Sequence, residues 1–337
     1  MTTSQAISSG LRATWRNKWM VLIFFACNLL MAAAIAAPMN TAIADHLGNS
    51  MVGQKMANGF DYSWLMEFQL AYAPFLKSFS IAVVWGSVLF LALNTVLSAG
   101  AFEVFRQSLL CSDGSPTGRA GSSAADRGVE DPALHTASLL GSRFPSLHVF
   151  GRGMGKYFLR FARIAIIASL FYFVAFWFWQ NLMGTAVTKL FENASVERWH
   201  FYTEWLRWAL LIFTVSVVNM VVEYAKADMV IDEHYSALGA FGHAAGFVFA
   251  NFGRVFFIYV ALGFMTLVTI FVYSVFARFF PQSSVATVFV WFVVAQLLLW
   301  FRWMFRLSSW GAAVSYYSGC RTPVATPEAV HAEHVEA

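Results

Sequence analysis

The sequence has 337 residues, of which 59% are hydrophobic and only 12% are charged, and its mean hydropathy is +0.60. Soluble globular proteins carry about 25% charged residues. This composition therefore excludes an ordinary soluble domain, which would expose large apolar patches to water. The formal net charge of +4 comes from basic residues beside apolar segments, so we expect contact with anionic lipid headgroups and no nucleic-acid partner.

Six apolar segments are each long enough to cross the hydrocarbon core of a bilayer, which takes about 20 helical residues. They are residues 19–37, 79–99, 164–183, 205–222, 255–277 and 285–305. We expect the first helix to end at Pro38. A short turn at 281–284 separates the last two segments, which predicts that they form an antiparallel hairpin. We predict an all-α polytopic membrane protein whose single six-helix domain covers residues 1–337.

The positions of the basic residues predict the orientation of these spans. With alternating loops, 16 Lys and Arg residues fall on the side of both termini and six on the other side. This distribution predicts that the N- and C-termini both lie in the cytoplasm. The first span also has features of a secretory signal peptide, with basic residues before it and small residues at 33–37. Its apolar stretch exceeds the 7–15 residues of such peptides, so we favour a retained span, and N-terminal sequencing distinguishes the two.

The segments between the spans differ in character. Residues 39–77 outside the membrane predict two short helices separated at Gly59, and residues 111–144 predict a flexible cytoplasmic insertion because they are rich in Gly and Ser. Residues 226–251 predict a short interfacial helix, in which Gly242 and Gly246 permit close helix contact. Residues 318–337 form a polar cytoplasmic tail.

A row of basic residues precedes the third span at spacings of four, four and three, which places them on one helical face. They are Arg152, Lys156, Arg160 and Arg163. One interpretation is a helix that contacts anionic lipid headgroups, and the other is the ordinary basic flank of a span. We favour the second interpretation, in which lipid contact is not specific.

The string Phe144-Pro145-Ser146-Leu147-His148 is similar to the phosphate-binding segment of the PAP2 lipid-phosphatase superfamily. That resemblance implies that Ser146 and His148 hold a phosphoryl group, which needs further positive charge around it. The family's upstream Lys-Arg motif and its downstream Ser-Arg and His-Asp motifs are missing from this sequence. A catalytic role for Ser146 and His148 is therefore weakly supported, and we identify no other catalytic residues.

Asp228 and Asp232 are four residues apart and share a helical face, which is compatible with a divalent cation. No HExxH motif accompanies them. The alternative, which we favour, is a solvated juxtamembrane face on which Glu223 pairs with Lys226 and Asp232 caps the following helix. We predict no metal site and no cofactor.

Polar residues within the spans are few and include Asn28, Asn94, Asn219 and Gln296, with scattered Ser and Thr. Ion-coupled carriers usually keep an ionisable group near the middle of the membrane, and these spans have none there. The Asn side chains are expected to bond one helix to another, although together they are also compatible with a pore.

Two further patterns show a resemblance across most of the chain. One is an external segment with Ser50, Gly59, Phe60, Asp61, Trp64 and Glu67, and the other is Gly-Lys-Tyr-Phe-x-Arg-Phe at residues 155–161. Together with the order of spans, they resemble a family of uncharacterised six-span bacterial inner-membrane proteins. The resemblance implies topology and bacterial origin and no activity.

These observations favour a non-catalytic scaffold or a subunit of an envelope or transport assembly, with a membrane-protein partner or a second copy of the chain. A passive permease or channel for a small or lipidic solute is the alternative. A lipid-phosphate phosphatase has the least support.

Overall fold

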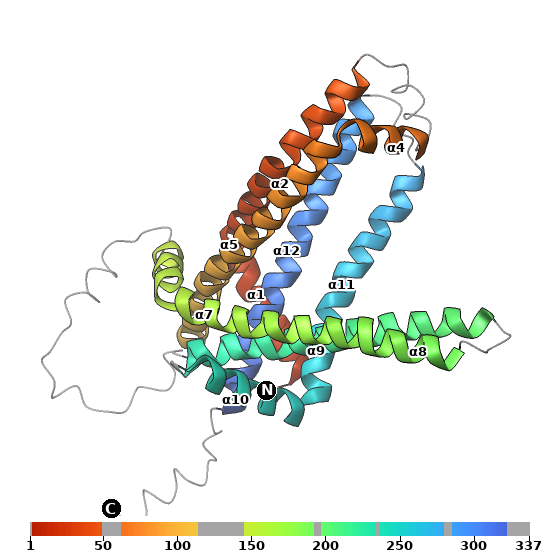
Figure 1. Cartoon of the computed structure of the whole chain (residues 1–337). Coiled ribbons are helices and arrows are strands. Elements are labelled where there is room, and N and C mark those ends of the chain that lie inside the picture. The colour runs from red at the N-terminus through yellow and green to blue at the C-terminus, as the bar shows by residue number, and fades with distance from the viewer. Residues whose placement is uncertain are drawn as a thin grey trace, which may run out of the picture. The chain divides into compact units, whose positions relative to one another are not determined.

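The computed structural model describes residues 2–48, 62–113, 145–191, 197–232, 236–279 and 285–321, and these are helical almost throughout (Figure 1). The elements are α1 (Thr3–Arg16), α2 (Lys18–Leu47), α4 (Tyr62–Ala71), α5 (Ala73–Asp113), α7 (Pro145–Trp177), the π-helix η1 (Phe178–Met183), α8 (Gly184–Phe191), α9 (Glu197–Ile231), α10 (Ala237–Ala250), α11 (Phe252–Phe279) and α12 (Val285–Arg321). Six helical segments are long and apolar enough to cross a membrane, on α2, α5, α7 with η1, α9, α11 and α12. The prediction of an all-α, six-span membrane protein is confirmed.

The helices extend beyond the predicted spans. α2 continues through Pro38 to Leu47, so the prediction that the first helix ends at Pro38 is wrong. Proline lacks the backbone N–H that would bond the carbonyl of Ala34, but membrane helices tolerate this loss. The Thr41 hydroxyl donates to the Pro38 carbonyl at 2.9 Å. α5 likewise runs to Asp113 and α12 to Arg321, where the insertion and the tail were expected to have begun.

Several predicted features lie outside the described residues. Residues 49–61, with the first part of the pattern from Ser50 to Glu67, are among them, as are residues 114–144 of the insertion and 322–337 of the tail.

The described part of the segment predicted to be external packs as a small aromatic core in which Trp64 and Phe68 of α4 are buried with Ala42 of α2. Phe68 stacks between Trp64 and Tyr72, with ring centroids 5.3 and 4.9 Å away.

The chain divides into two compact units, and the second comprises Thr14–Ser98 and Leu262–Leu307. In this unit α2 contacts α5 where Gly86 faces Ile35, so closely that a Cβ on the glycine would lie 2.9 Å from Ile35 Cδ1. α2 also contacts α12 through Phe24 and Trp303, whose ring centroids are 5.1 Å apart.

The first unit comprises Met1–Ala13, Ala99–Ala261 and Ser308–Ala337. Within it α7 and α9 lie side by side (Figure 1). α1 packs against α12 so tightly that a Cβ on Gly10 would lie 2.5 Å from the Ser308 carbonyl oxygen. The helical state of this N-terminal segment was not predicted.

α10 confirms a short helix after Lys226 but differs from the prediction in two ways. Its N-cap is Ser236, whose hydroxyl accepts from the Gly239 N–H at 3.2 Å, and not Asp232. Its buried face consists of Ala237, Ala240, Ala244 and Val248. A Cβ on Gly242 or Gly246 would meet nothing within 4 Å, so the predicted close contact at these glycines is wrong.

Candidate functional site

The best-buried part of the first unit is formed by residues 99–105 of α5, 220–230 of α9 and 308–317 of α12, which we call the α5–α9–α12 core. Each stretch begins near the end of the predicted span on its helix. Small residues of this core allow α7 and α1 to approach it closely. A Cβ on Gly100 would lie 2.7 Å from the ring of Phe150 on α7, and one on Gly311 would lie 3.1 Å from the Cα of Gly10 on α1. This core holds ionisable side chains, which makes it the candidate site.

Two carboxylates of α9 are bonded to α12 inside this core. Asp228 is 0% exposed and accepts a hydrogen bond from the hydroxyl of Tyr317. Glu223 is 3% exposed and its Oε2 accepts from the Ser309 hydroxyl at 3.0 Å. Burying a carboxylate costs free energy unless hydrogen bonds replace those of water. The two pairs supply such bonds and fix the register of α9 against α12.

A third carboxylate, Glu103 of α5, is bonded within its own helix, and the stem of its side chain packs against α7. Its side chain is 5% exposed, and Oε1 accepts from Arg106 Nη2 at 2.9 Å and from Gln107 Nε2 at 3.4 Å. On α7, Gly153 faces the stem of this side chain, because a Cβ there would lie 2.6 Å from Glu103 Cβ. The absence of a side chain at Gly153 therefore lets α7 approach α5 closely at the stem of Glu103.

Lys226 lies between aromatic rings from neighbouring helices. Its Nζ is 5.6 Å from the ring centroid of Phe161 on α7 and 5.8 Å from that of Trp310 on α12. Phe102 of α5 contacts both rings, with centroids 5.7 and 5.6 Å away. The ammonium group thus gains cation–π contact with a cluster that joins four helices.

Tyrosines complete the core next to Asp228. Tyr224 of α9 and Tyr316 and Tyr317 of α12 surround Phe247 of α10, with ring centroids 5.5, 6.0 and 4.9 Å from that of Phe247. The core thus brings together acidic, basic and phenolic groups from α5, α9 and α12.

The structure overturns the expected surroundings of Asp228 and Glu223. Both were assigned to a solvated face, and both are buried, because α9 continues beyond its apolar span into the core. Asp232 is partly exposed at the end of α9. Within the described ranges no three His, Cys, Asp or Glu side chains are placed to hold a metal ion. Glu233 and His234 lie outside them.

The basic row on α7 borders its buried face. Arg152, Lys156 and Arg163 are exposed and Arg160 is partly exposed. Lys156 Nζ and Arg160 Cζ also lie 5.0 and 5.6 Å from the ring centroid of buried Tyr157. Cation–π contact therefore holds two of the four basic groups beside the helix while leaving charge available for lipid.

Ser146 and His148 lie in the first turn of α7, and His148 is exposed. Glu223, Asp228 and the tyrosines lie on other helices, in the α5–α9–α12 core. The structure thus places the phosphatase-like residues at a helix end.

The hydrogen bonds of the polar span residues differ among Asn28, Asn94, Asn219 and Gln296. Asn219 of α9 joins three helices: its Nδ2 donates to Tyr259 of α11 at 2.7 Å, and its Oδ1 accepts from Tyr172 of α7 at 3.4 Å. Asn28 and Asn94 instead donate to the carbonyls of Phe24 and Phe90 in their own helices. Asn219 therefore bonds one helix to another, as expected. The bonds that Asn28 and Asn94 donate stay within their own helices, so the expectation is wrong for those bonds. Gln296 Oε1 is buried and forms no hydrogen bond with the described residues.

Asn219→Ala is expected to lower the free energy of unfolding by about 0.6 to 1.7 kcal/mol, the range for hydrogen bonds between membrane helices. Asn94→Ala is the matched control and should cost less, because it removes only a bond within one helix. Denaturation of the purified protein in mixed detergent–SDS micelles measures both. Equal losses would contradict a role of Asn219 in joining helices.

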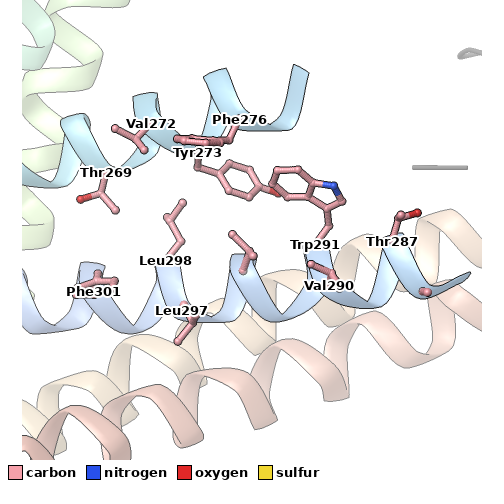
Figure 2. A pocket seen from close by; sticks show the side chains of 12 residues that line it. Thr269, Val272, Tyr273, Phe276, Thr287, Val290, Trp291, Leu297, Leu298 and Phe301 are labelled. Atoms are coloured by element: carbon pink, nitrogen blue, oxygen red, sulfur yellow. The ribbon is translucent and has the colours of Figure 1, made fainter. Parts of the chain in front are cut away.

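An apolar groove lies in the second unit between α11 and α12, and its volume is about 670 Å³ (Figure 2). Val272, Tyr273, Val290, Trp291, Leu298 and Phe301 are among its lining residues. Figure 2 shows the rings of Tyr273 and Trp291 meeting between the two helices, and their centroids are 5.5 Å apart at an interplanar angle of 83°. The sequence analysis did not identify this groove.

Comparison of the chain with protein-family models, with characterised proteins and with solved structures finds no match. The site is therefore interpreted from its own residues.

Glu103, Ser309 and Tyr317 were not predicted as residues of the site. A signal was present, because residues 97–101 (Leu-Ser-Ala-Gly-Ala) and 307–313 (Leu-Ser-Ser-Trp-Gly-Ala-Ala) combine small residues with apolar ones. Such segments are typical of closely packed helices. The first lies at the end of its predicted span and the second lies beyond its span, which indicates that packing continues there.

Proposed function

We propose that the chain is a non-catalytic, multi-pass scaffold or subunit of a membrane assembly. The observation that carries this proposal is the pairing of Asp228 with Tyr317 and of Glu223 with Ser309. In these pairs the two carboxylates of α9 are engaged in hydrogen bonds with α12. Each pair ties one carboxylate oxygen of α9 to a hydroxyl of α12 inside the core, and buried polar contacts of this kind favour one defined arrangement of helices, which suits a protein that presents surfaces to partners.

The surface best suited to a partner is the hairpin of α7 and α9. Phe173 and Phe176 on α7 and Trp205 and Trp208 on α9 are 67, 56, 64 and 45% exposed. Within a bilayer such side chains face lipid tails or another membrane protein. A second copy of the chain or another integral membrane protein is the proposed partner.

The proposed setting is a bacterial inner membrane with both termini in the cytoplasm, as the 16-to-6 distribution of basic residues favours. Arg152, Lys156, Arg160 and Arg163 would then lie at the cytoplasmic headgroups. Reporter fusions at the two ends of the chain test this orientation.

Cysteine cross-linking in native membranes tests the scaffold proposal. In a chain whose Cys27, Cys111 and Cys320 are replaced by serine, Phe173→Cys is expected to form cross-linked species through a short bifunctional reagent. Phe271→Cys on α11, where Phe271 is 68% exposed, is the control and should remain uncross-linked. Absence of cross-links, together with purification as a monomer alone in several mild detergents, would contradict the proposal.

The α11–α12 groove supports the alternative of a passive permease for a lipidic solute. Its apolar lining suits a hydrocarbon, whereas the bonds that Asn28 and Asn94 donate to their own helices give no support to a pore lined by these residues. Transfer of a fluorescent lipid between the leaflets of liposomes tests it. Transfer no faster than in protein-free liposomes would exclude this activity.

A further inference from the structure

The lining of the α11–α12 groove is apolar and suits a hydrocarbon chain. Apolar side chains supply most of its lining, and its volume of about 670 Å³ falls within the range of about 300–1,000 Å³ found for ligand sites. Of the hydroxyl-bearing residues in its lining, Thr269, Tyr273 and Thr287, Thr269 donates to the Met265 carbonyl of its own helix at 2.9 Å. A polar solute would lose hydrogen bonds with water on entering, whereas a hydrocarbon chain loses none.

A positive charge borders the groove face of α12, one helical turn beyond the lining residue Leu298. Arg302 follows Leu298 by four residues, so the two share a helical face one turn apart. The Arg302 side chain is exposed, and position 302 lies near the end of the predicted span at 285–305. A guanidinium group at this depth can reach the headgroup level and attract an anionic phosphate.

Toward its opposite end the groove is crossed by aromatic rings, and Phe276, Ala286 and Thr287 line it beyond them. Tyr273 of α11 and Trp291 of α12 meet across the groove (Figure 2). Positions 291 and 302 are separated by about 16 Å along the helix axis, at about 1.5 Å per residue. One leaflet of the hydrocarbon core is about 15 Å deep. The distance from the charge to the aromatic pair thus matches one lipid tail extending from its headgroup.

We infer that the α11–α12 groove binds one acyl chain of an anionic phospholipid, with its phosphate at Arg302 and its chain end at the Tyr273–Trp291 pair. The lipid comes from the leaflet that Arg302 faces, which is the cytoplasmic leaflet in the expected orientation. This site is separate from the basic row of α7 and does not depend on the scaffold proposal. The bound chain fills the space between α11 and α12 within the second unit.

Native mass spectrometry of the purified full-length protein tests the headgroup. Phosphatidylglycerol is expected to remain bound in preference to phosphatidylcholine with the same chains. Arg302→Gln should reduce this preference about fivefold, the effect of about 1 kcal/mol per basic residue near an anionic headgroup. Lys77→Gln removes an exposed charge from α5, outside the groove, and should leave the preference unchanged. Equal effects of the two substitutions would overturn the assignment of the headgroup.

Photo-cross-linking tests the chain. Phosphatidylglycerol with a diazirine at the end of one acyl chain is expected to label Tyr273, Val290 or Trp291 in the wild-type protein. Leu298→Trp fills the groove and should abolish this labelling, whereas Leu89→Trp, at a position 59% exposed on α5, should not. Labelling of α5 around Val88 as intense as that of the groove would show only bulk lipid contact and overturn the proposal.

Discussion

Asp228→Ala is expected to lower the free energy of unfolding by about 3 kcal/mol, the largest loss that we predict for a single side chain. Asp228 is fully buried and accepts a hydrogen bond from Tyr317. Hydrogen bonds to charged groups contribute about 1.5–3 kcal/mol, and the substitution also leaves the tyrosine hydroxyl in an apolar core. Denaturation in mixed detergent–SDS micelles, followed by circular dichroism, measures the loss.

Two companion variants separate the hydrogen bond from the charge. Tyr317→Phe removes only the donor and should cost about 2 kcal/mol. Asp228→Asn keeps an acceptor and removes the buried charge, so its cost should be below about 1 kcal/mol. Tyr62→Phe, at a position 66% exposed on α4, is the control and should change stability by less than about 0.5 kcal/mol.

A double-mutant cycle decides whether the pair acts as a unit. With Asp228→Ala and Tyr317→Phe combined, the total loss should be smaller than the sum of the single losses by about 1–2 kcal/mol. Additive losses would show that the two side chains stabilise the core independently. An Asn variant as unstable as the Ala variant would show that the negative charge itself is needed, contrary to a purely structural pair.

The fold was largely predictable because the spans have a strong, local signal. About 20 consecutive apolar residues are a property of one segment, and all six predicted segments lie on helices of sufficient length and hydropathy. The helix ends were less predictable, because α2, α5 and α12 continue where the apolar signal ends. In α2, the helix passes Pro38, a residue that usually marks a boundary in soluble proteins.

The candidate site was much less predictable, because burial depends on residues distant in the sequence. Asp228 occurs in a polar context that indicates a solvated face, and only contact with Tyr317, 89 residues later, places it in a core. Asn94 and Asn219 are the same type of residue, and each lies within a predicted span. Their different roles depend on whether Tyr172 and Tyr259 lie within reach, which the sequence does not state.

Gly153→Ala is expected to destabilise the protein by about 1–3 kcal/mol, although alanine favours helix more than glycine does. The added Cβ would lie 2.6 Å from Glu103 Cβ and 3.2 Å from the Ala99 carbonyl oxygen. Neither atom belongs to the flexible end of a side chain, so α7 and α5 must separate. Micellar denaturation measures the cost.

The same helix supplies matched controls. Gly151 and Gly155 lie two residues to either side of Gly153, and a Cβ on either would meet nothing within 4 Å. Gly151→Ala and Gly155→Ala should therefore be neutral or stabilise by up to about 1 kcal/mol, through helix propensity alone. Opposite signs at neighbouring glycines would establish that α7 contacts α5 at Glu103 through this one position. A stabilising effect of all three substitutions would show that the contact with Glu103 is not formed.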